Sequence, residues 1–524
     1  MSRAGDSLVA LEPAARAGVA EAADRARTTG QTRWVARVIE VEAIDPLAGF
    51  ARSQAQDRFF WEQVDTGESF CAWGVADETE SAGRRRFEDV RAWSERVRER
   101  IHWLGSGRPA SSPLLLGGFG FEDDPASSEH WKSFPPARFV LPAVLGERRD
   151  GRMRWVLLAR IEPGVPAATV EGELEARLAE ALDTQQPQAL ATQEPETAPR
   201  EGKTERAASE RRPLSDPSLL PWVSGPEYRV QSDRPHEVYT AQVARALDEI
   251  GRGRLQKIVL ARSLRVDHEG SLDVPGFLDR LRSIYSSCAL IAMARGEDTF
   301  LAATPETLVR LRDRDLSTAA LAGSAPRGRS PEEDRALGAA LEASEKDRAE
   351  HAHVVEAIRA AIEPFCETLE IPAEPRLRGL FGIQHLETPV SGRLREAARS
   401  VAGARPVDVL DLVSALHPTP AVGGVPAPAA REWLRRFEGL DRGWYAAPLG
   451  WLDAGGGGDF RVALRSGLLR SRRPERSGLP PEAIDESHAW LFAGAGIVDG
   501  SQPEQELAET RIKLRALLAP LTEI

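Results

Sequence analysis

Lysine is scarce in this sequence of 524 residues, with five lysines against 63 arginines. Either residue can supply positive charge on a surface. A chain with this bias is therefore expected to keep lysine mainly at positions where arginine cannot perform the same function. Arginine holds its proton at any useful pH, whereas a desolvated lysine can lose it. One of the five, Lys257, interrupts the apolar segment "LQKIVLAR" at residues 255–262. Lys257 is therefore a candidate base, and the alternative is an edge residue whose amine reaches solvent.

Cysteine is also rare, and its positions exclude two classes of site. Cys71, Cys288 and Cys366 lie far apart and form no CxxC pair. Neither a disulfide framework nor a zinc site is predicted, and a reducing compartment fits best. The first residues contain no apolar core of a signal peptide and include acidic side chains, which transit peptides avoid. We expect a cytoplasmic protein.

Long apolar runs are missing as well. None approaches the roughly 18 residues of a membrane-spanning helix, so no membrane partner is expected. The net charge of -12 argues against nonspecific binding to nucleic acid or to an anionic membrane. A local basic pocket for an anionic metabolite is compatible with this charge. At 42% hydrophobic residues, the chain is long enough to bury a large core.

Sequence patterns divide the chain into four regions. Residues 1–30, rich in alanine and arginine, are expected to form a poorly ordered tail or a loose helix. Residues 31–182 contain short alternating segments between turn clusters, a pattern typical of β structure. Residues 183–217 have almost no large apolar side chains, which predicts a linker or a disordered insertion. In residues 218–524, strands alternate with clear helices.

N-terminal signals place two helices in the last region. Ser330, Pro331 and Glu333 have the capping-box arrangement, with proline at the first helical position, and predict one helix over 330–362. The same kind of opening predicts the last helix over 501–518.

Acidic residues on both helices suggest a Mg²⁺ site. Asp347 and Glu350 precede apolar residues on one stripe of the first helix, and Glu506 and Glu509 share a face of the last helix with Lys513. Mg²⁺ is typically held by one or two carboxylates together with substrate oxygens and water. The alternatives are a surface ion pair between Glu509 and Lys513 and a solvated charged face around "EKDRAEH".

Three other segments suggest a ligand pocket. Glu306 lies in a break between apolar runs, where burial can raise the pKa of a glutamate and make it a general acid; a turn glutamate in solvent is the alternative. The stretch "AGAGIVDG", 493–500, fails as a dinucleotide-binding loop because its spacing is GxGxxxG and no room is left for a second strand. Its glycines are expected to let backbone amides approach an anionic group. The stretch "LHPTPAVGGVP", 416–426, predicts a stiff wall beside a ligand or a structural turn.

Together these motifs resemble the chorismate-utilising enzyme family, and within it the isochorismate synthases. The resemblance covers about residues 225–520. It is carried, in order, by "LQKIVLAR", "FLAATPETLVRL", "LAGSAPRG", "SEKDRAEHAHVV", "QHLETPVSGRL", "LHPTPAVGG", "DRGWYAAPLGW", "FRVALRS" and "LFAGAGIVDGSQPEQELAETRIKL". The stretches "FFWEQ", "GGFGF" and "HWKSFPPARFVLP" resemble the N-terminal half of such enzymes.

The fold implied by this resemblance is a single α+β domain with two stacked, mainly antiparallel sheets flanked by helices. Both halves of the chain are expected to contribute strands to it. The implied substrate is chorismate and the implied cofactor is Mg²⁺. No glutaminase subunit is expected, and we expect a monomer.

The resemblance also implies residue roles. Lys257 is the implied general base that activates water for attack at C2 of the chorismate ring, and Glu306 is the implied acid that protonates the departing C4 hydroxyl. The implied metal residues are Glu350 and Glu509, with Asp347 and Glu506 nearby. The implied substrate-binding residues are Gly323, His385, Tyr445, Arg465, Gly494, Gly496 and Lys513.

Related activities share most of these motifs. These activities are those of anthranilate, aminodeoxychorismate and salicylate synthases. The discriminating feature is the "HPTPAVGG" loop, because enzymes of the amine-inserting and salicylate types generally carry a different version that contains threonine and lysine. Salicylate formation is the second hypothesis, because it needs only an added pyruvate elimination in the same pocket. A catalytically silent chorismate-binding protein is the third, and the presence of Lys257, Glu306, Glu350 and Glu509 together argues against it. The product would feed menaquinone or siderophore biosynthesis.

Overall fold

The computed structural model describes most of the chain. It covers residues 10–105, 114–124, 128–149, 151–184, 228–380, 382–396, 405–471 and 486–522. The linker or disordered insertion expected at 183–217 lies outside the described residues, except for its first two positions, which end a helix.

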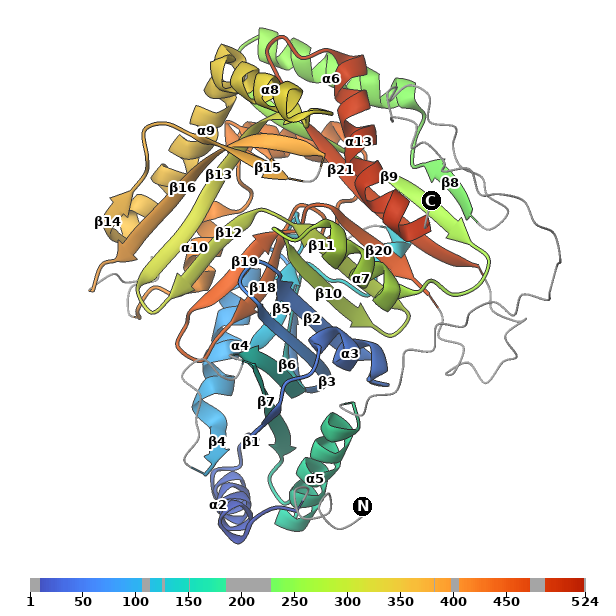
Figure 1. The fold of residues 1–524 in the computed structure, drawn as a ribbon. Coiled ribbons are helices and arrows are strands. Elements are labelled where there is room, and N and C mark those ends of the chain that lie inside the picture. The colour runs from blue at the N-terminus through green and yellow to red at the C-terminus, as the bar shows by residue number, and fades with distance from the viewer. Residues whose placement is uncertain are drawn as a thin grey trace, which may run out of the picture.

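Strands make up most of the interior (Figure 1). In the first half they are β1 (Arg33–Glu42), β2 (Asp57–Gln63), β3 (Glu68–Ser81), β4 (Ile101–Leu104), β5 (Leu115–Phe119), β6 (Ala137–Arg149) and β7 (Arg152–Ile161). In the second half they are β8 (Tyr228–Ser232), β9 (Lys257–His268), β10 (Ala289–Arg295), β11 (Asp298–Thr304), β12 (Thr307–Arg312), β13 (Asp315–Pro326), β14 (Cys366–Glu370), β15 (Arg376–Leu380), β16 (Ile383–Leu394), β17 (Gly424–Val425), β18 (Pro448–Leu452), β19 (Gly458–Val462), β20 (Ser466–Arg470) and β21 (Ser487–Val498).

Helices surround these strands, with α6, α8 and α13 at one end of the molecule and α2 and α5 at the other (Figure 1). The α-helices are α2 (Pro13–Thr29), α3 (Pro46–Arg52), α4 (Arg86–Arg100), α5 (Ala167–Asp183), α6 (His236–Gly251), α7 (Val274–Ile284), α8 (Pro331–Ala343), α9 (Glu345–Ile362), α10 (Val409–Leu416), α11 (Ala427–Phe437) and α13 (Pro503–Thr522). Two 3-10 turns, η1 (Glu129–Trp131) and η3 (Glu363–Phe365), accompany them. Within the described ranges, no helix has both the length and the apolar character needed to cross a membrane.

The strands form a connected network that divides at β6. Along one edge β6 pairs with β3, and along the other it pairs first with β5 and then with β7. One arm continues from β3 through β2, β10, β11, β20 and β21 to β9. The other arm continues from β5 through β18, β19, β12 and β13 to β16. Every pairing along both arms is antiparallel.

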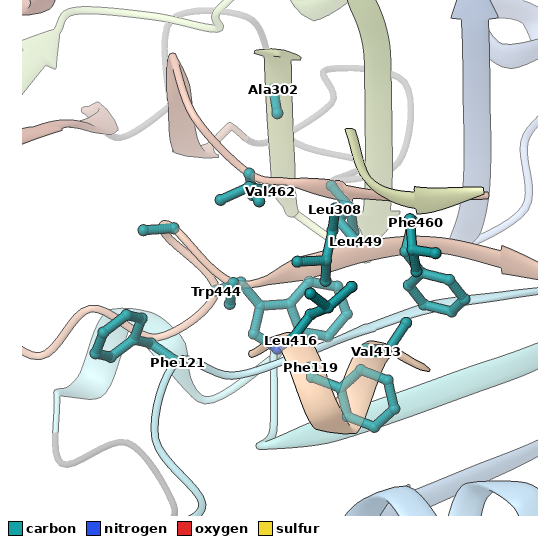
Figure 2. Close-up of a cluster of buried hydrophobic side chains, with 14 of the residues drawn as sticks. Phe119, Phe121, Ala302, Leu308, Val413, Leu416, Trp444, Leu449, Phe460 and Val462 are labelled. Carbon is teal, nitrogen blue, oxygen red and sulfur yellow. The ribbon is translucent and has the colours of Figure 1, made fainter. Parts of the chain in front are cut away.

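The two arms are the two stacked sheets that the resemblance predicts, and each contains strands from both halves of the chain. The main apolar core lies between them, because Phe300 and Ala302 of one arm belong to the same buried cluster as Leu308, Phe460 and Val462 of the other. Figure 2 shows part of this cluster. Helices α13, α6 and α7 pack on the first arm. Strands covered on both faces read as apolar runs, which explains the composition of β10 and β11.

Two expectations about helices can be compared with the structure. Residues 13–29, for which a poorly ordered tail or a loose helix was expected, form helix α2, whose Val19, Ala22 and Ala26 are buried and which contacts α5 and β4. Small side chains on one stripe allow this close packing. The helix expected over 330–362 is two helices, because Ser344 has an extended backbone and caps α9 by accepting a hydrogen bond from the amide of Asp347.

Phe119 of β5 joins the two halves of the chain and provides a test of the fold. Its ring is 4.2 Å from Phe87, 5.1 Å from Phe139 and 6.4 Å from Phe460, measured between centroids. We expect Phe119→Ala to lower the free energy of unfolding by about 3–5 kcal/mol, because it leaves a cavity in a shared core. Urea unfolding followed by fluorescence and circular dichroism should show one coincident transition. Val238→Ala, at an exposed position, should change stability by less than about 0.5 kcal/mol, and separate transitions for the two halves would contradict this picture.

Candidate active site

A cavity of about 940 Å³ opens between helices α7, α8 and α13 and strands β9, β13, β16 and β21. Eleven of the 13 site residues predicted from the sequence line it. They are Lys257, Glu306, Gly323, Glu350, His385, Tyr445, Arg465, Gly494, Gly496, Glu509 and Lys513. Asp347 and Glu506 do not line the cavity. Residues far apart in the sequence therefore meet at one place.

Lys257 begins strand β9 and is buried, with an exposed fraction of 1%. Strand β9 is paired on both sides at this residue, with Val498 of β21 and Val425 of β17. An edge lysine that reaches solvent is therefore excluded. The Lys257 amine instead donates a 2.8 Å hydrogen bond to Oε1 of Glu350 on α9, and the two side chains form an ion pair.

Gly496 of β21 makes room for this ion pair. A β-carbon at this position would lie 3.2 Å from Oε1 of Glu350 and 3.4 Å from Cε of Lys257. At Gly494, two residues earlier on the same face, a β-carbon would lie 3.1 Å from the Tyr445 hydroxyl oxygen. The stretch "AGAGIVDG" is thus mostly a paired strand, and its glycines admit the side chains of the cavity.

Glu306 lies between β11 and β12 and is buried, so the turn glutamate in solvent is excluded. Burial raises the pKa of its carboxyl group to about 7, and the positive charges of Lys257 and Lys513 partly oppose this shift. No hydrogen bond to this carboxyl group is found from the described residues. A carboxylic acid that keeps its proton near neutral pH can serve as a general acid.

The four carboxylates expected at a metal site divide into two pairs. Glu350 and Glu509 face the cavity, and each has a lysine partner: Glu350 with Lys257, and Glu509 with Lys513, whose amine is 2.6 Å from Oε1 of Glu509. Asp347 accepts a 2.5 Å hydrogen bond from the Ser344 hydroxyl at the start of α9.

Glu506 is buried behind the cavity. Burial raises the pKa of its carboxyl group; a hydrogen bond from Ser501 opposes this shift, and the nearby charge of Glu509 adds to it. Two cavity-facing carboxylates match the number that Mg²⁺ usually takes from a protein. Glu350 and Glu509 therefore fit the ion, and Asp347 and Glu506 lie behind them.

In the part of the chain that the structure describes, the expected metal residues do not bring three ligand atoms within 4.8 Å of one another. The set that does so is Asp267, Glu486 and His488, away from the cavity. Its carboxylates already pair with arginines: Asp267 with Arg265 at 2.6 Å, and Glu486 with Arg229. This set is an ion-pair cluster where β9 ends and β21 begins.

His385 on β16 is held by the bend in β13. Its Nδ1 lies 3.2 Å from the carbonyl oxygen of Gly323 and 2.9 Å from the Ser324 hydroxyl. A carbonyl oxygen can only accept, so Nδ1 carries the hydrogen and Nε2 is an acceptor. Burial, with Arg465 and Lys513 nearby, lowers the pKa of His385 to about 3. The ring is neutral at physiological pH.

Arg442 is a buried residue of the site that was not singled out from the sequence. Its guanidinium donates to the carbonyl oxygens of Val259 at 2.7 Å and Val422 at 2.8 Å, and it forms an ion pair with Glu438. Arg442 therefore ties β9 to the loop 416–426. Ala421 and Val422 of that loop line the cavity.

The cavity is basic although the chain is acidic. Nine lysines and arginines line it against four glutamates. Besides Arg442, five of these arginines were not predicted from the sequence. They lie on α7, in the segment between β13 and α8, and on α13: Arg280, Arg327, Arg329, Arg511 and Arg515. Such a lining raises the local concentration of anions.

Comparison with known proteins agrees with this geometry. The family model described as "Chorismate binding enzyme" matches residues 20–211 and 224–522. The chain belongs to this family. The match includes the strands of both arms and every residue that lines the cavity.

Two curated relatives match nearly the full chain. The "Salicylate biosynthesis isochorismate synthase" of Pseudomonas aeruginosa is 37% identical over 94% of this chain and 90% of its own length. The "Isochorismate synthase MenF" of Bacillus subtilis is 30% identical over 97% of each chain.

Solved structures share the fold. The menaquinone-specific isochorismate synthase MenF from Escherichia coli has a TM-score of 0.68 and 24% identity, covering 96% of this chain and all of its own. The putative 2,3-dihydroxybenzoate-specific isochorismate synthase DhbC from Bacillus anthracis has a TM-score of 0.62 and 25% identity, over 91% of this chain and 98% of its own.

The raised pKa of Glu306 predicts a pH-dependent stability. Folded Glu306 keeps its proton up to a pH of about 7, whereas in the unfolded chain it ionises near the ordinary value of 4.5. The stability contributed by the neutral carboxyl group is complete below pH 4.5 and is lost as the pH rises through 7. Between pH 4.5 and 8, the unfolding free energy of the wild type should therefore fall by about 3 kcal/mol relative to Glu306→Gln.

Urea denaturation at several pH values measures this difference. Glu342→Gln removes an exposed glutamate and should follow the wild type throughout. Parallel stability profiles for the wild type and Glu306→Gln would show that the Glu306 carboxyl group titrates normally.

Proposed function

We propose that the protein is an isochorismate synthase that converts chorismate to isochorismate with Mg²⁺. One observation carries the proposal: a buried lysine and a buried glutamic acid, whose pKa is raised to about 7, line the same basic cavity. Family membership supports chorismate as the ligand. The names of the two full-length relatives support isochorismate synthesis.

Chorismate carries two carboxylates, and the cavity offers separate cationic groups for them. Arg465 and Lys513 lie on different elements, and Lys513 is held by the carbonyl oxygen of Gly494 at 2.9 Å. The Tyr445 ring stacks on Phe492 with centroids 5.4 Å apart, and its hydroxyl group faces Gly494. Charge-assisted hydrogen bonds from such groups fix the ring over the base and the acid.

The exchange of hydroxyl groups needs one proton removed and one delivered. After its ammonium group has passed one proton to solvent, Lys257 accepts a proton from water while the water oxygen bonds to C2. Both ring double bonds shift as the C4–O bond breaks, and Glu306 donates its proton so that the C4 hydroxyl leaves as water. One water molecule enters and one leaves, so the reaction is an isomerisation. Proton exchange with solvent then restores both residues.

Glu350 and Glu509 would hold Mg²⁺, with Asp347 and Glu506 behind them. The bound ion would supply positive charge against the ring carboxylate of the substrate. The present lysine partners of Glu350 and Glu509 support this assignment, because both carboxylates already attract cations at the cavity surface.

The proposal also covers the location, the oligomeric state and the pathway of the enzyme. We infer a cytoplasmic monomer that needs no glutaminase, because the reaction consumes no ammonia. The solved structure from Escherichia coli is described as menaquinone-specific, and a "Vibriobactin-specific isochorismate synthase" of Vibrio cholerae is 32% identical over 54% of this chain. We propose that the product feeds menaquinone or siderophore biosynthesis.

Product analysis tests the activity. The protein is incubated with chorismate and Mg²⁺, and parallel samples contain EDTA. Chromatography should show isochorismate as the only new compound, at equilibrium with chorismate, and EDTA should suppress its formation. Salicylate with pyruvate would instead support the salicylate synthase hypothesis, and binding without conversion would support a silent chorismate-binding protein.

Two substitutions of Lys257 separate its chemical role from its structural one. Lys257→Ala should abolish turnover because the base is lost. Lys257→Arg keeps a cation beside Glu350 but cannot release a proton, so it should also be inactive, with a rate reduced at least about 100-fold. Circular dichroism and thermal melting should show folded variants. Lys132→Ala changes an exposed lysine and should keep the wild-type rate; substantial turnover by Lys257→Arg would contradict the role of general base.

A further inference from the structure

Arg465 differs in its surroundings from three other cations that line the cavity, Lys257, Lys513 and Arg442. Lys257, Lys513 and Arg442 each have a glutamate partner. Arg465 also lines the cavity, yet no ion pair to it is found within the described residues. Its backbone has a φ of 43°, in the left-handed region that non-glycine residues rarely adopt. Such strain at a cavity residue indicates that the position of the side chain matters.

Two neutral side chains hold the Arg465 guanidinium from behind. Its Nη1 donates to Sγ of Cys288 at 3.5 Å, and its Cζ lies 5.4 Å from the centroid of the Tyr285 ring. Cys288 and Tyr285 are buried, and neither lines the cavity. They therefore contact the arginine without contacting a ligand in the cavity.

The neutrality of these partners preserves the charge of Arg465. Burial raises the pKa of the Cys288 thiol, and burial also raises the pKa of the Tyr285 hydroxyl to about 12. A carboxylate in their place would neutralise the guanidinium and compete with an anionic ligand. A thiol and an aromatic face orient the group and leave its charge for the ligand.

The same two residues connect Arg465 to the C-terminal helix. The Tyr285 amide closes α7 by donating to the carbonyl oxygen of Leu281, and the Cys288 amide donates to the carbonyl oxygen of Tyr285, so both belong to one turn. The Tyr285 hydroxyl donates to the carbonyl oxygen of Ala516 on α13 at 2.8 Å. Helix α13 also carries Glu509 and Lys513. The turn thus connects Arg465 with the helix that carries Lys513.

We propose that Cys288 and Tyr285 are positioning residues that hold Arg465 in the orientation that receives a carboxylate of the substrate. The inference rests on the proposed function, because it takes chorismate as the ligand. Arg465 holds the carboxylate in both the ground state and the transition state. Loosening its support therefore weakens binding and leaves the chemical step unchanged.

Kinetics of Cys288 variants test this inference. In Cys288→Ala the guanidinium loses one hydrogen-bond acceptor, so the KM for chorismate should rise about fivefold with kcat unchanged. Cys288→Ser keeps an acceptor and should recover part of the loss. Cys71→Ala and Cys366→Ala remove buried thiols elsewhere and serve as matched controls with wild-type KM. Melting temperatures establish that each variant is folded.

Tyr285 variants separate the ring from the hydroxyl group. Tyr285→Leu removes the aromatic face, and its KM should rise about fivefold with kcat unchanged. Tyr285→Phe keeps the face under Arg465 and loses the bond to α13, so its KM should rise less. A fall in kcat with unchanged KM in the folded variants would indicate a different role for the turn.

Calorimetric titration with chorismate gives a second measurement that does not depend on turnover. The dissociation constant should rise with KM across the Cys288 and Tyr285 variants and stay constant in the two cysteine controls. If the wild type binds chorismate without converting it, the proposed activity fails while this series still tests the positioning. Wild-type affinity in both Cys288→Ala and Tyr285→Leu would overturn the inference.

Discussion

The ion pair between Lys257 and Glu350 joins the start of strand β9 to helix α9 at the surface of the cavity. Lys257 is buried at a position where β9 is paired on both sides. Removing one member of such a pair leaves an uncompensated charge, which typically costs about 3–5 kcal/mol. The backbone is adapted to the pair, since a β-carbon at position 496 would lie 3.2 Å from Oε1 of Glu350 and would crowd the pair. Strand β21, strand β9 and helix α9 are therefore constrained together.

Burial acts differently on the titratable groups of the cavity because their partners differ. Lys257 and Lys513 have carboxylate partners. Among the described residues no ion-pair partner is found for Glu306, and burial raises the pKa of its carboxyl group to about 7. His385 is close to cations and stays neutral. The result is a site that contains a protonated acid, a neutral acceptor and several cations at the same pH. An anionic substrate that must lose a hydroxyl group as water needs these three properties together.

The sequence predicted the groups that take part in chemistry better than those that support them. Lys257 stood out because lysine is rare in this chain, and Glu306 stood out because it interrupts apolar segments. Arg442 and Arg465 are two of 63 arginines, so only a resemblance between motifs pointed to Arg465, and nothing marked Arg442. The roles of Cys288 and Tyr285 depend on a long-range approach of α7 to β20, which local patterns do not encode.

Local sequence patterns also failed to predict some features of the fold. The opening of α8 was predicted from its cap, but Ser344, which ends one helix and begins the next, looks like an ordinary polar residue within a helical pattern. Spacing placed Asp347 beside Glu350 on one helical stripe, yet the start of α9 turns Asp347 towards Ser344 and away from the cavity. The division of the network at β6 depends on pairing along both edges of one strand, which a one-dimensional pattern cannot express.

Helix α13 has a consequence for the order in which the protein matures. It supplies Glu509 and Lys513, and its contacts are with β21, β9, α6 and α7, which come from widely separated parts of the chain. Residues 257 to 513 must therefore all be synthesised before the cavity that is expected to bind chorismate can form. Domains tend to form from the N-terminal side during synthesis. In the nascent chain, the basic lining and the buried lysine are brought together only when this late helix docks, so partly made molecules stay unable to capture the metabolite.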